Sequence, residues 1–242
     1  GIVVDCLEAD DIYEFRDKRI AGAFRSANFS DSGRVQQMVR EYHLRFVQVR
    51  NAEIRDRFSD PSRIPFNDVM TMAYHSAIVS ERIPGETIRW ARLAAQQCEQ
   101  RRLYGRAVER LLPAVNLVRG RTDLAVALED RMDILLHHAE LVLKVDGDSQ
   151  TALESLDQVE REVGRMPEGA RENVSARHAL TSATLAYRSR RFSEVDGIVD
   201  ALINNPSATA WMRLRGLFLA AISMDPREQA GDKHERLEAL YV

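Results

Sequence analysis

Carboxylates near the start of the chain have a spacing that could hold a divalent metal ion. The run Asp10-Asp11-x-x-Glu14 places three of them close together. Oxygen atoms of aspartate and glutamate are ligands that magnesium prefers, usually together with phosphate groups of a substrate. A second set of oxygen-bearing side chains begins with Asn67-Asp68. A chain that used both sets would need helices to bring them to one centre.

The first run resembles the metal-binding motif of class I terpene synthases, which are all-helical enzymes, and the second resembles the start of their other metal motif. The resemblance implies that Asp10, Asp11 and Asp68 hold magnesium diphosphate. However, His75 stands where the second motif needs a carboxylate, and too little chain precedes the first motif for a helical barrel to surround it. We therefore expect an acidic helix start at the first run and a helix cap at Asn67. A helical metal-dependent enzyme remains an alternative.

The remaining polar motifs do not indicate catalysis. His137 and His138 are adjacent, so they point to different faces of a helix and cannot chelate one metal ion together. The run Asp146-Gly147-Asp148 lacks the further ligands of a calcium loop and is typical of an ordinary turn. The chain contains no HExxH motif, no glycine-rich phosphate loop and no GxSxG motif. We expect no catalytic residue, no metal and no cofactor.

The composition argues against two classes of protein. The 34 basic and 37 acidic residues are interspersed and give a net charge of −3, whereas nucleic-acid binders usually carry a basic excess. No apolar run approaches the roughly 20 residues that a membrane span needs. The two cysteines, Cys6 and Cys98, lie far apart, which is typical of a reducing compartment. We expect a cytoplasmic protein that binds neither nucleic acid nor a membrane.

Apolar residues recur at helical spacing through most of the chain, and proline, glycine or aspartate residues separate the periodic segments. Short links between helices force neighbouring helices to be antiparallel. In the segment before Ser59 the predicted helical stripe contains Val35, Met38, Val39, Tyr42, Phe46, Val49 and Ile54. The predicted helices are 7–25, 34–58, 67–82, 86–101, 103–118, 123–145, 149–164, 170–189, 192–204, 207–224 and 226–241.

Three of these helices share one packing stripe. Residues at offsets of 3, 4 and 3 lie on one face of a helix, and the anchors at 107, 152 and 195 are nearly equally spaced. A near-constant period is the signature of stacked helical hairpins. The sequence thus predicts an all-α fold, an α-solenoid of antiparallel helix hairpins in a right-handed superhelical stack, with a plain bundle as the alternative. The stripes are Tyr104/Ala107/Leu111/Ala114, Ser149/Ala152/Leu156/Val159 and Phe192/Val195/Val199/Leu202.

The first hairpin of the series resembles a tetratricopeptide repeat. Ala95 stands at the small position of the first helix, Tyr104 at the aromatic position that opens the second, and Ala107 at the small position after it. Trp211-x2-Leu214-x3-Phe218 resembles the start of another such repeat. The family's period of 34 residues is shorter than the spacing in this chain, so the resemblance is to a degenerate repeat.

The resemblance implies two parts, an N-terminal helical extension or cap at 1–65 and a repeat domain at 66–242. The segment 101–118 is also similar to the repeat regions that precede CHAT protease domains. Because the chain begins with Gly1, a regulatory or sensor module excised from a larger signalling protein or CHAT-type protease remains an alternative. We expect Trp90 and Trp211, which each open a first helix, to lie in the core.

Such repeats bind extended segments in a concave groove lined by their first helices. The resemblance therefore implies a non-catalytic scaffold whose partner is a protein or peptide segment with at least one acidic group, and end repeats could also form homo-oligomers. Reversing the charge of Arg92 and Arg177 is expected to weaken binding without unfolding the chain. The expected partner-binding residues are Arg89, Arg92, Gln96, Gln100, Asp133, Glu140, Lys144, Arg177, Thr184 and Arg188.

Overall fold

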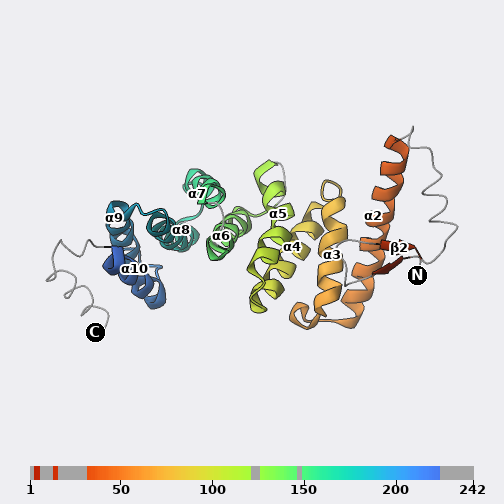
Figure 1. Ribbon diagram of the computed structural model, residues 1–242, viewed down its shortest axis with the longest axis horizontal. Helices are drawn as coiled ribbons and strands as arrows, with labels where there is room; N and C mark the ends of the chain where they lie inside the picture. Colours follow the sequence, from red (N-terminus) through yellow and green to blue (C-terminus); the bar gives the residue numbers. More distant parts are fainter. Residues whose placement is uncertain (1–2, 6–12, 16–31, 121–125, 146–148, 224–242) are drawn as a thin grey trace.

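A computed structural model of the chain describes residues 3–5, 13–15, 32–120, 126–145 and 149–223. Apart from two short strands, these residues form α-helices that pack on one another, so the fold is all-α as predicted. The helices follow one another along the longest axis of the molecule, from α2 at one end to α10 at the other (Figure 1). Their bounds are α2 Ser32–Arg57, α3 Phe66–Ile78, α4 Pro84–Gln100, α5 Tyr104–Gly120, α6 Leu128–Lys144, α7 Ser149–Val163, α8 Glu168–Arg188, α9 Phe192–Ile203 and α10 Ala210–Ser223.

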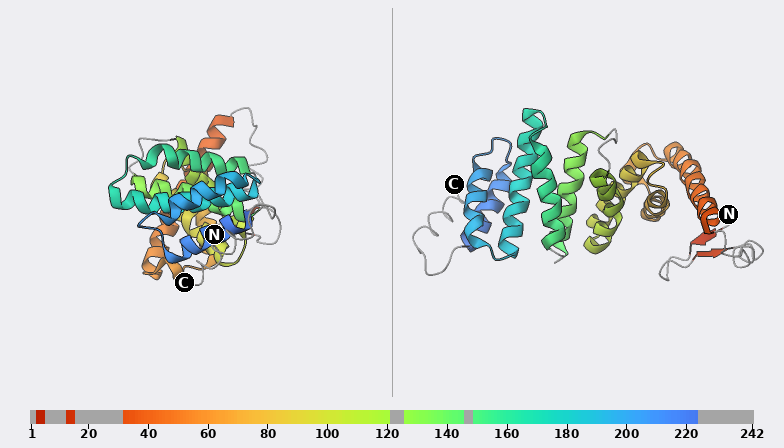
Figure 2. Two further views of the ribbon diagram at one scale, coloured as in Figure 1. Left: turned by 90° about the vertical axis from the view of Figure 1, so that its left-hand side faces the viewer. Right: turned by 90° about the horizontal axis from the view of Figure 1, so that it is seen from above.

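The direction of the helices changes part-way along the stack. In Figure 1, α3 to α5 lie near the plane of the view, whereas α6 to α8 are seen nearly end-on. From above, the green to blue helices α6 to α10 stand side by side in one row (right-hand view of Figure 2). The change of direction falls between α5 and α6.

The predicted packing stripe is buried in all three second helices. Each hairpin pairs consecutive helices, α4 with α5, α6 with α7 and α8 with α9. In the first of them, small side chains of α4 such as Ala91 and Ala95 face Leu111 of α5, which lets the two backbones approach closely. The first residues of two stripes are less buried: Tyr104 is half-buried and Phe192 is exposed. The buried stripe residues are Ala107, Leu111, Ala114, Ala152, Leu156, Val159, Val195, Val199 and Leu202.

Two hairpins turn in the same way at equivalent positions. Arg102 and Arg190, just after α4 and α8, adopt the left-handed conformation with φ of 59° and 57°. The amide of Leu103 donates to the carbonyl of Cys98 at 2.9 Å, and that of Arg191 to Ala186 at 2.8 Å. This six-residue closure satisfies the last carbonyls of a helix and usually has glycine at the left-handed position.

We expect Arg102→Gly and Arg190→Gly each to raise the free energy of unfolding by about 1 kcal/mol. The left-handed conformation costs free energy for a residue with a Cβ atom, and it costs almost none for glycine. Ser189→Gly is the control, because Ser189 has φ of −80° and gains nothing from glycine. Thermal melting of the three variants measures the effect, and equal or lower stability of both arginine variants would contradict it.

The N-terminal helix predicted at 7–25 is wrong where the structure describes it. Residues Val3–Asp5 form strand β1 and residues Tyr13–Phe15 form strand β2, and the two pair antiparallel. The aromatic residues on either side of Glu14 alternate with it, and this pattern suits a strand better than a helix. The helix prediction did not take this alternation into account. The rest of 7–25, like the predicted helix 226–241, lies outside the described residues.

The buried face of α2 agrees with the predicted stripe only in part. Ile54 of the stripe is buried, whereas Met38, Tyr42 and Val49 are exposed, and Val47, which lies outside the stripe, is buried. Among the helices, α2 packs extensively against α3 alone, so a narrow face is enough to cover the contact. The same core cluster includes Val69 of α3 and Trp90 of α4. It therefore crosses the predicted boundary between residues 65 and 66.

The two tryptophans have opposite environments. Trp90 is fully buried, as predicted, but Trp211 is 59% exposed, so its predicted core position is wrong. The helix α10 contacts α8 and α9 through its opposite face. A Cβ atom on Gly216 of that face would lie 2.9 Å from the Leu202 side chain, which shows how closely α10 approaches α9.

Buried histidines join neighbouring helices. His43 of α2 and His75 of α3 share a hydrogen bond of 2.8 Å between their Nδ1 atoms, and the ring of Phe46 stacks on His75 at 4.0 Å. One Nδ1 must donate and the other accept, so this contact holds a single proton. His138 of α6 lies 2.9 Å from the hydroxyl of Ser155 in α7. Burial lowers the pKa of His75 and of His138 to about 4.

Candidate functional site

Charged side chains of the first helices α4, α6 and α8 pair with one another. The two nitrogens of the Arg92 guanidinium donate to Asp130 at 2.8 Å and to Asp133 at 2.6 Å. The other oxygen of Asp133 accepts from Arg177 at 2.6 Å, and Arg177 also donates to Glu140 at 3.1 Å. Four of the predicted binding residues thus form one continuous ion-pair network across three helices.

Burial and charge act in opposite directions on Arg177. Burial lowers the pKa of its guanidinium, but the carboxylates of Glu140 and Asp133 outweigh that effect and raise the pKa overall. The guanidinium is therefore held in its charged form by two fixed anions. A partner that needed Arg177 would first have to break these pairs.

A second bridge joins α4 to α6 at the other end of α4. Glu99 accepts from Lys144 and from His137, the latter at 3.1 Å. The ammonium group of Lys144 also lies 5.6 Å from the ring centre of Tyr104. Lys144, another predicted binding residue, is therefore already engaged within the chain.

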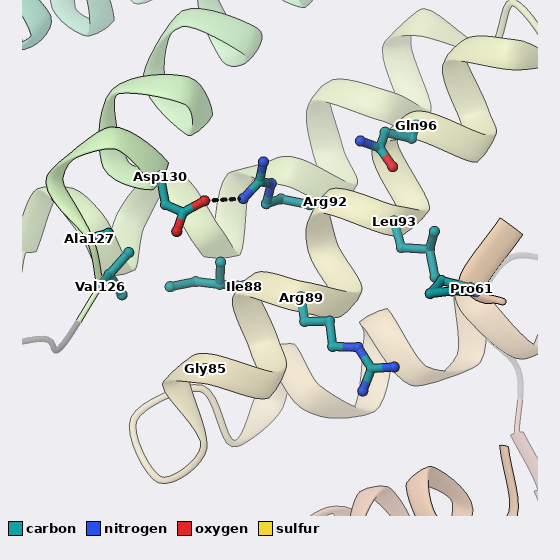
Figure 3. Close-up of a pocket in the computed structure, with 10 residues that line it drawn as sticks. All are labelled: Pro61, Gly85, Ile88, Arg89, Arg92, Leu93, Gln96, Val126, Ala127 and Asp130. Atoms are coloured by element: carbon teal, nitrogen blue, oxygen red, sulfur yellow. Dashed lines mark hydrogen bonds and ion pairs between the residues drawn. The ribbon is translucent and has the colours of Figure 1, made fainter. Parts of the chain in front are cut away.

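A cleft of about 460 Å³ lies between α4, the start of α6 and the turn at Pro61 (Figure 3). It follows the outer face of α4, because residues spaced by four, such as Ile88, Arg92 and Gln96, project from the same side of a helix. The ion pair of Arg92 with Asp130 crosses it, as the dashed line in Figure 3 shows. The lining residues are Pro61, Gly85, Ile88, Arg89, Arg92, Leu93, Gln96, Val126, Ala127 and Asp130.

The remaining predicted residues are spread over the surface. Gln100 lies one helical turn beyond Gln96 and is exposed like it. Thr184 donates to the carbonyl of Leu180 in its own helix at 2.9 Å. Neither Thr184 nor Arg188, the last residue of α8, lines the cleft. The structure thus gathers Arg89, Arg92 and Gln96 around one cavity.

Much of the cleft could not be recognised from the sequence. Asp130 comes from α6 and Pro61 from the turn after α2, and no local motif connects either of them to Arg89. Leu93 carried a weak signal, because it lies four positions after Arg89 and so on the same side of α4 as that residue. Finding the others required the packing of three segments that are distant in sequence.

The metal-dependent alternative gains no support from the described residues. Asp68 accepts from Arg50 at 2.7 Å, and Asp10 and Asp11 lie outside the described residues. In the part of the chain that the structure describes, no three His, Cys, Asp or Glu side chains are grouped to hold a metal ion.

Comparison with known proteins gives one result. No family model, curated protein or solved structure matches this chain. None of the described helices is both long and apolar enough to cross a membrane.

Proposed function

We propose that the chain is an α-solenoid of degenerate, tetratricopeptide-like hairpins, with a right-handed superhelical twist, that acts as a non-catalytic scaffold. The partner is a segment of another protein bound on the outer face of α4. The observation that carries the proposal is the cleft of about 460 Å³ that Arg89, Arg92 and Gln96 line together. Concave sites with apolar walls and a few polar groups are where proteins usually take ligands.

Three features favour a stacked array over a plain bundle. The buried stripes recur at residues 107, 152 and 195, and the left-handed turns at Arg102 and Arg190 are two such repeats apart. Extensive helix contacts join elements that are adjacent or next-but-one in the chain. The elongated succession of helices in Figure 1 is what such contacts produce. A cytoplasmic location belongs to this proposal too, because the buried Cys98 is a free thiol.

Site-specific photo-crosslinking tests the proposal. A photoreactive amino acid replaces Gln96 or Gln100 on the outer face of α4, and, as the control, Glu160, an exposed residue of α7 outside the cleft. After irradiation in cells, we expect positions 96 and 100 to capture the same protein, and position 160 not to capture it. Purified partner should then bind the chain, and peptide mapping should place the crosslink within one short segment.

Crosslinks of equal yield at all three positions, or none at 96 and 100, would contradict binding at the cleft. Gln96, Gln100 and Glu160 are all exposed, so each variant should fold like the wild type, and circular dichroism checks this. If the chain instead converted a small molecule, and replacing Arg89 abolished that activity, the result would favour an enzyme over a scaffold.

A further inference from the structure

The two arginines of the cleft differ in what they can still bind. Arg92 donates from both terminal nitrogens to carboxylates at 2.8 and 2.6 Å, so it is already satisfied. Arg89 has weaker partners, because its Nη1 lies 3.3 Å from Asn51 and 3.5 Å from Glu86. The Nε and Nη2 atoms of Arg89 have no hydrogen-bond partner among the described residues. Its guanidinium carbon also lies 5.0 Å from the ring centre of Trp90. Of the two arginines, Arg89 is therefore the one with donor atoms still available to a ligand.

The free edge of Arg89 is suited to one kind of group. Nε and Nη2 point in parallel and match the two oxygens of a carboxylate, which arginine binds with paired hydrogen bonds. The Arg89 side chain is 35% exposed, so a ligand can reach it without unfolding α4. In Figure 3 its guanidinium points away from the pair of Arg92 with Asp130. The nearby anions already have cationic partners, because Glu86 accepts from Arg55 at 2.9 Å and Asp130 accepts from Arg92 at 2.8 Å.

Apolar walls lie beside this charge. Ile88 and Leu93 of α4 line the cleft together with Val126, which lies just before α6. The side chain of Ile88 stands between Arg92 and Val126 in Figure 3. A cavity with this lining can bury an aliphatic side chain, which favours binding because the apolar surface of that side chain leaves water.

Two amides continue the same face. Gln96 and Gln100 are exposed, four positions apart, and neither has a hydrogen-bond partner among the described residues. Neighbours at this spacing lie about 6 Å apart on a helix, close to the two-residue repeat of an extended chain. Side-chain amides both donate and accept, so they can pair with the backbone of a strand-like segment.

We propose that the partner segment is extended and carries an aliphatic side chain close to an aspartate or glutamate. The aliphatic group enters between Ile88, Leu93 and Val126, and the carboxylate pairs with the free edge of Arg89. Gln96 and Gln100 bind the backbone of the segment. This inference rests on the proposed function and assigns the chemistry of its partner.

Fluorescein-labelled nonapeptides in a Gly-Ser background test this chemistry on the full chain. One pair carries Leu and Glu two positions apart in either order, and matched peptides replace Glu by Gln or Leu by Ser. By fluorescence anisotropy we expect one Leu/Glu order to bind best, with about tenfold weaker binding for each replacement. Arg89→Gln should abolish the preference for Glu over Gln but keep that for Leu over Ser. Leu93→Ser should abolish the preference for Leu over Ser but keep that for Glu over Gln.

Arg106→Gln is the matched control, because Arg106 is exposed on α5 outside the cleft. It should leave all affinities unchanged. The inference is overturned if the Leu/Glu peptides bind no better than the matched peptides, or if Arg89→Gln keeps the preference for Glu. If either result is found while positions 96 and 100 still crosslink one partner, the scaffold proposal is kept and only the proposed chemistry of the partner is rejected. If the crosslinks are missing too, both proposals fall.

Discussion

Replacing Arg177 with glutamate is expected to lower the free energy of unfolding by about 2 kcal/mol, since it replaces the cation of a partly buried ion-pair network with an anion. Arg177 holds Asp133 at 2.6 Å and Glu140 at 3.1 Å. The substitution would place three carboxylates together where two anions and a cation now balance. The contact of α8 with α6, where these residues lie, should weaken most.

Urea unfolding followed by circular dichroism measures this effect, and a charge swap controls for it. Glu140 pairs with Arg177 but not with Arg92, so the double variant Arg177→Glu, Glu140→Arg should recover at least half of the lost stability. A loss below about 0.5 kcal/mol for Arg177→Glu would mean that the pairs behave as ordinary surface ion pairs.

The same network changes how binding at the cleft has to be tested. From sequence, reversing Arg92 and Arg177 was expected to weaken binding while leaving the fold intact. Both residues are bound to Asp133, and they also pair with Asp130 and Glu140, so that double variant would place five carboxylates beside one another between α4, α6 and α8. Weaker binding by such a variant would report lost structure. Arg89, with its long and replaceable contacts, is the position that separates binding from folding.

The second large effect is a loss of stability in mild acid. The pKa values of His75 and His138 are about 4 because both rings are buried, compared with 6.5 for a free histidine. Below pH 6.5 the unfolded chain therefore binds protons that the folded chain does not. Stability should be complete above pH 6.5 and should fall as the pH drops toward 4, by about 3 kcal/mol for each histidine at the lower limit.

Urea unfolding at pH 7 and at pH 5 measures the effect, which should reach about 2 kcal/mol for each histidine over this range. His75→Gln keeps a hydrogen-bonding partner for His43 but cannot titrate. This variant should lose less stability between the two pH values than the wild type. An unchanged pH dependence in His75→Gln would show that His75 does not hold a depressed pKa.

The hairpins could be predicted because their signals are local. Ala107, Leu111 and Ala114 lie within two turns of one helix, and all three are buried as their spacing indicated. Short polar or proline-containing links marked the ends of most helices within a few residues. In these segments the pattern of apolar residues and the actual neighbours agree, since each second helix packs on the helix just before it.

The positions at the ends of the stack could not be predicted in the same way. Met38, Tyr42 and Trp211 have helical spacing and apolar side chains, yet they are exposed. A repeating pattern shows which residues share a face but does not show whether another helix covers that face. For α2 and α10 the answer depends on how many neighbours the helix has.

In the candidate site too, the features that depend on one helix could be predicted, and those that depend on packing between helices could not. The register of α4 placed Arg89, Arg92 and Gln96 on one face, and all three line the cleft. The sequence could not show that Arg92 is neutralised by Asp130 and Asp133, because these residues come from another hairpin. Which of two similar arginines remains free to bind is a property of the packed structure.

The order of helix contacts also has a consequence for folding. Every pair of helices in extensive contact is adjacent or next-but-one along the chain, so native contacts form without closing long loops. A chain with such short-range contacts folds quickly for its length, and each hairpin can add to a neighbour that has already formed. Among the described helices, α2 and α10 have neighbours on one side only, so hydrogen exchange should be fastest in these two and slowest in α6, midway along the stack.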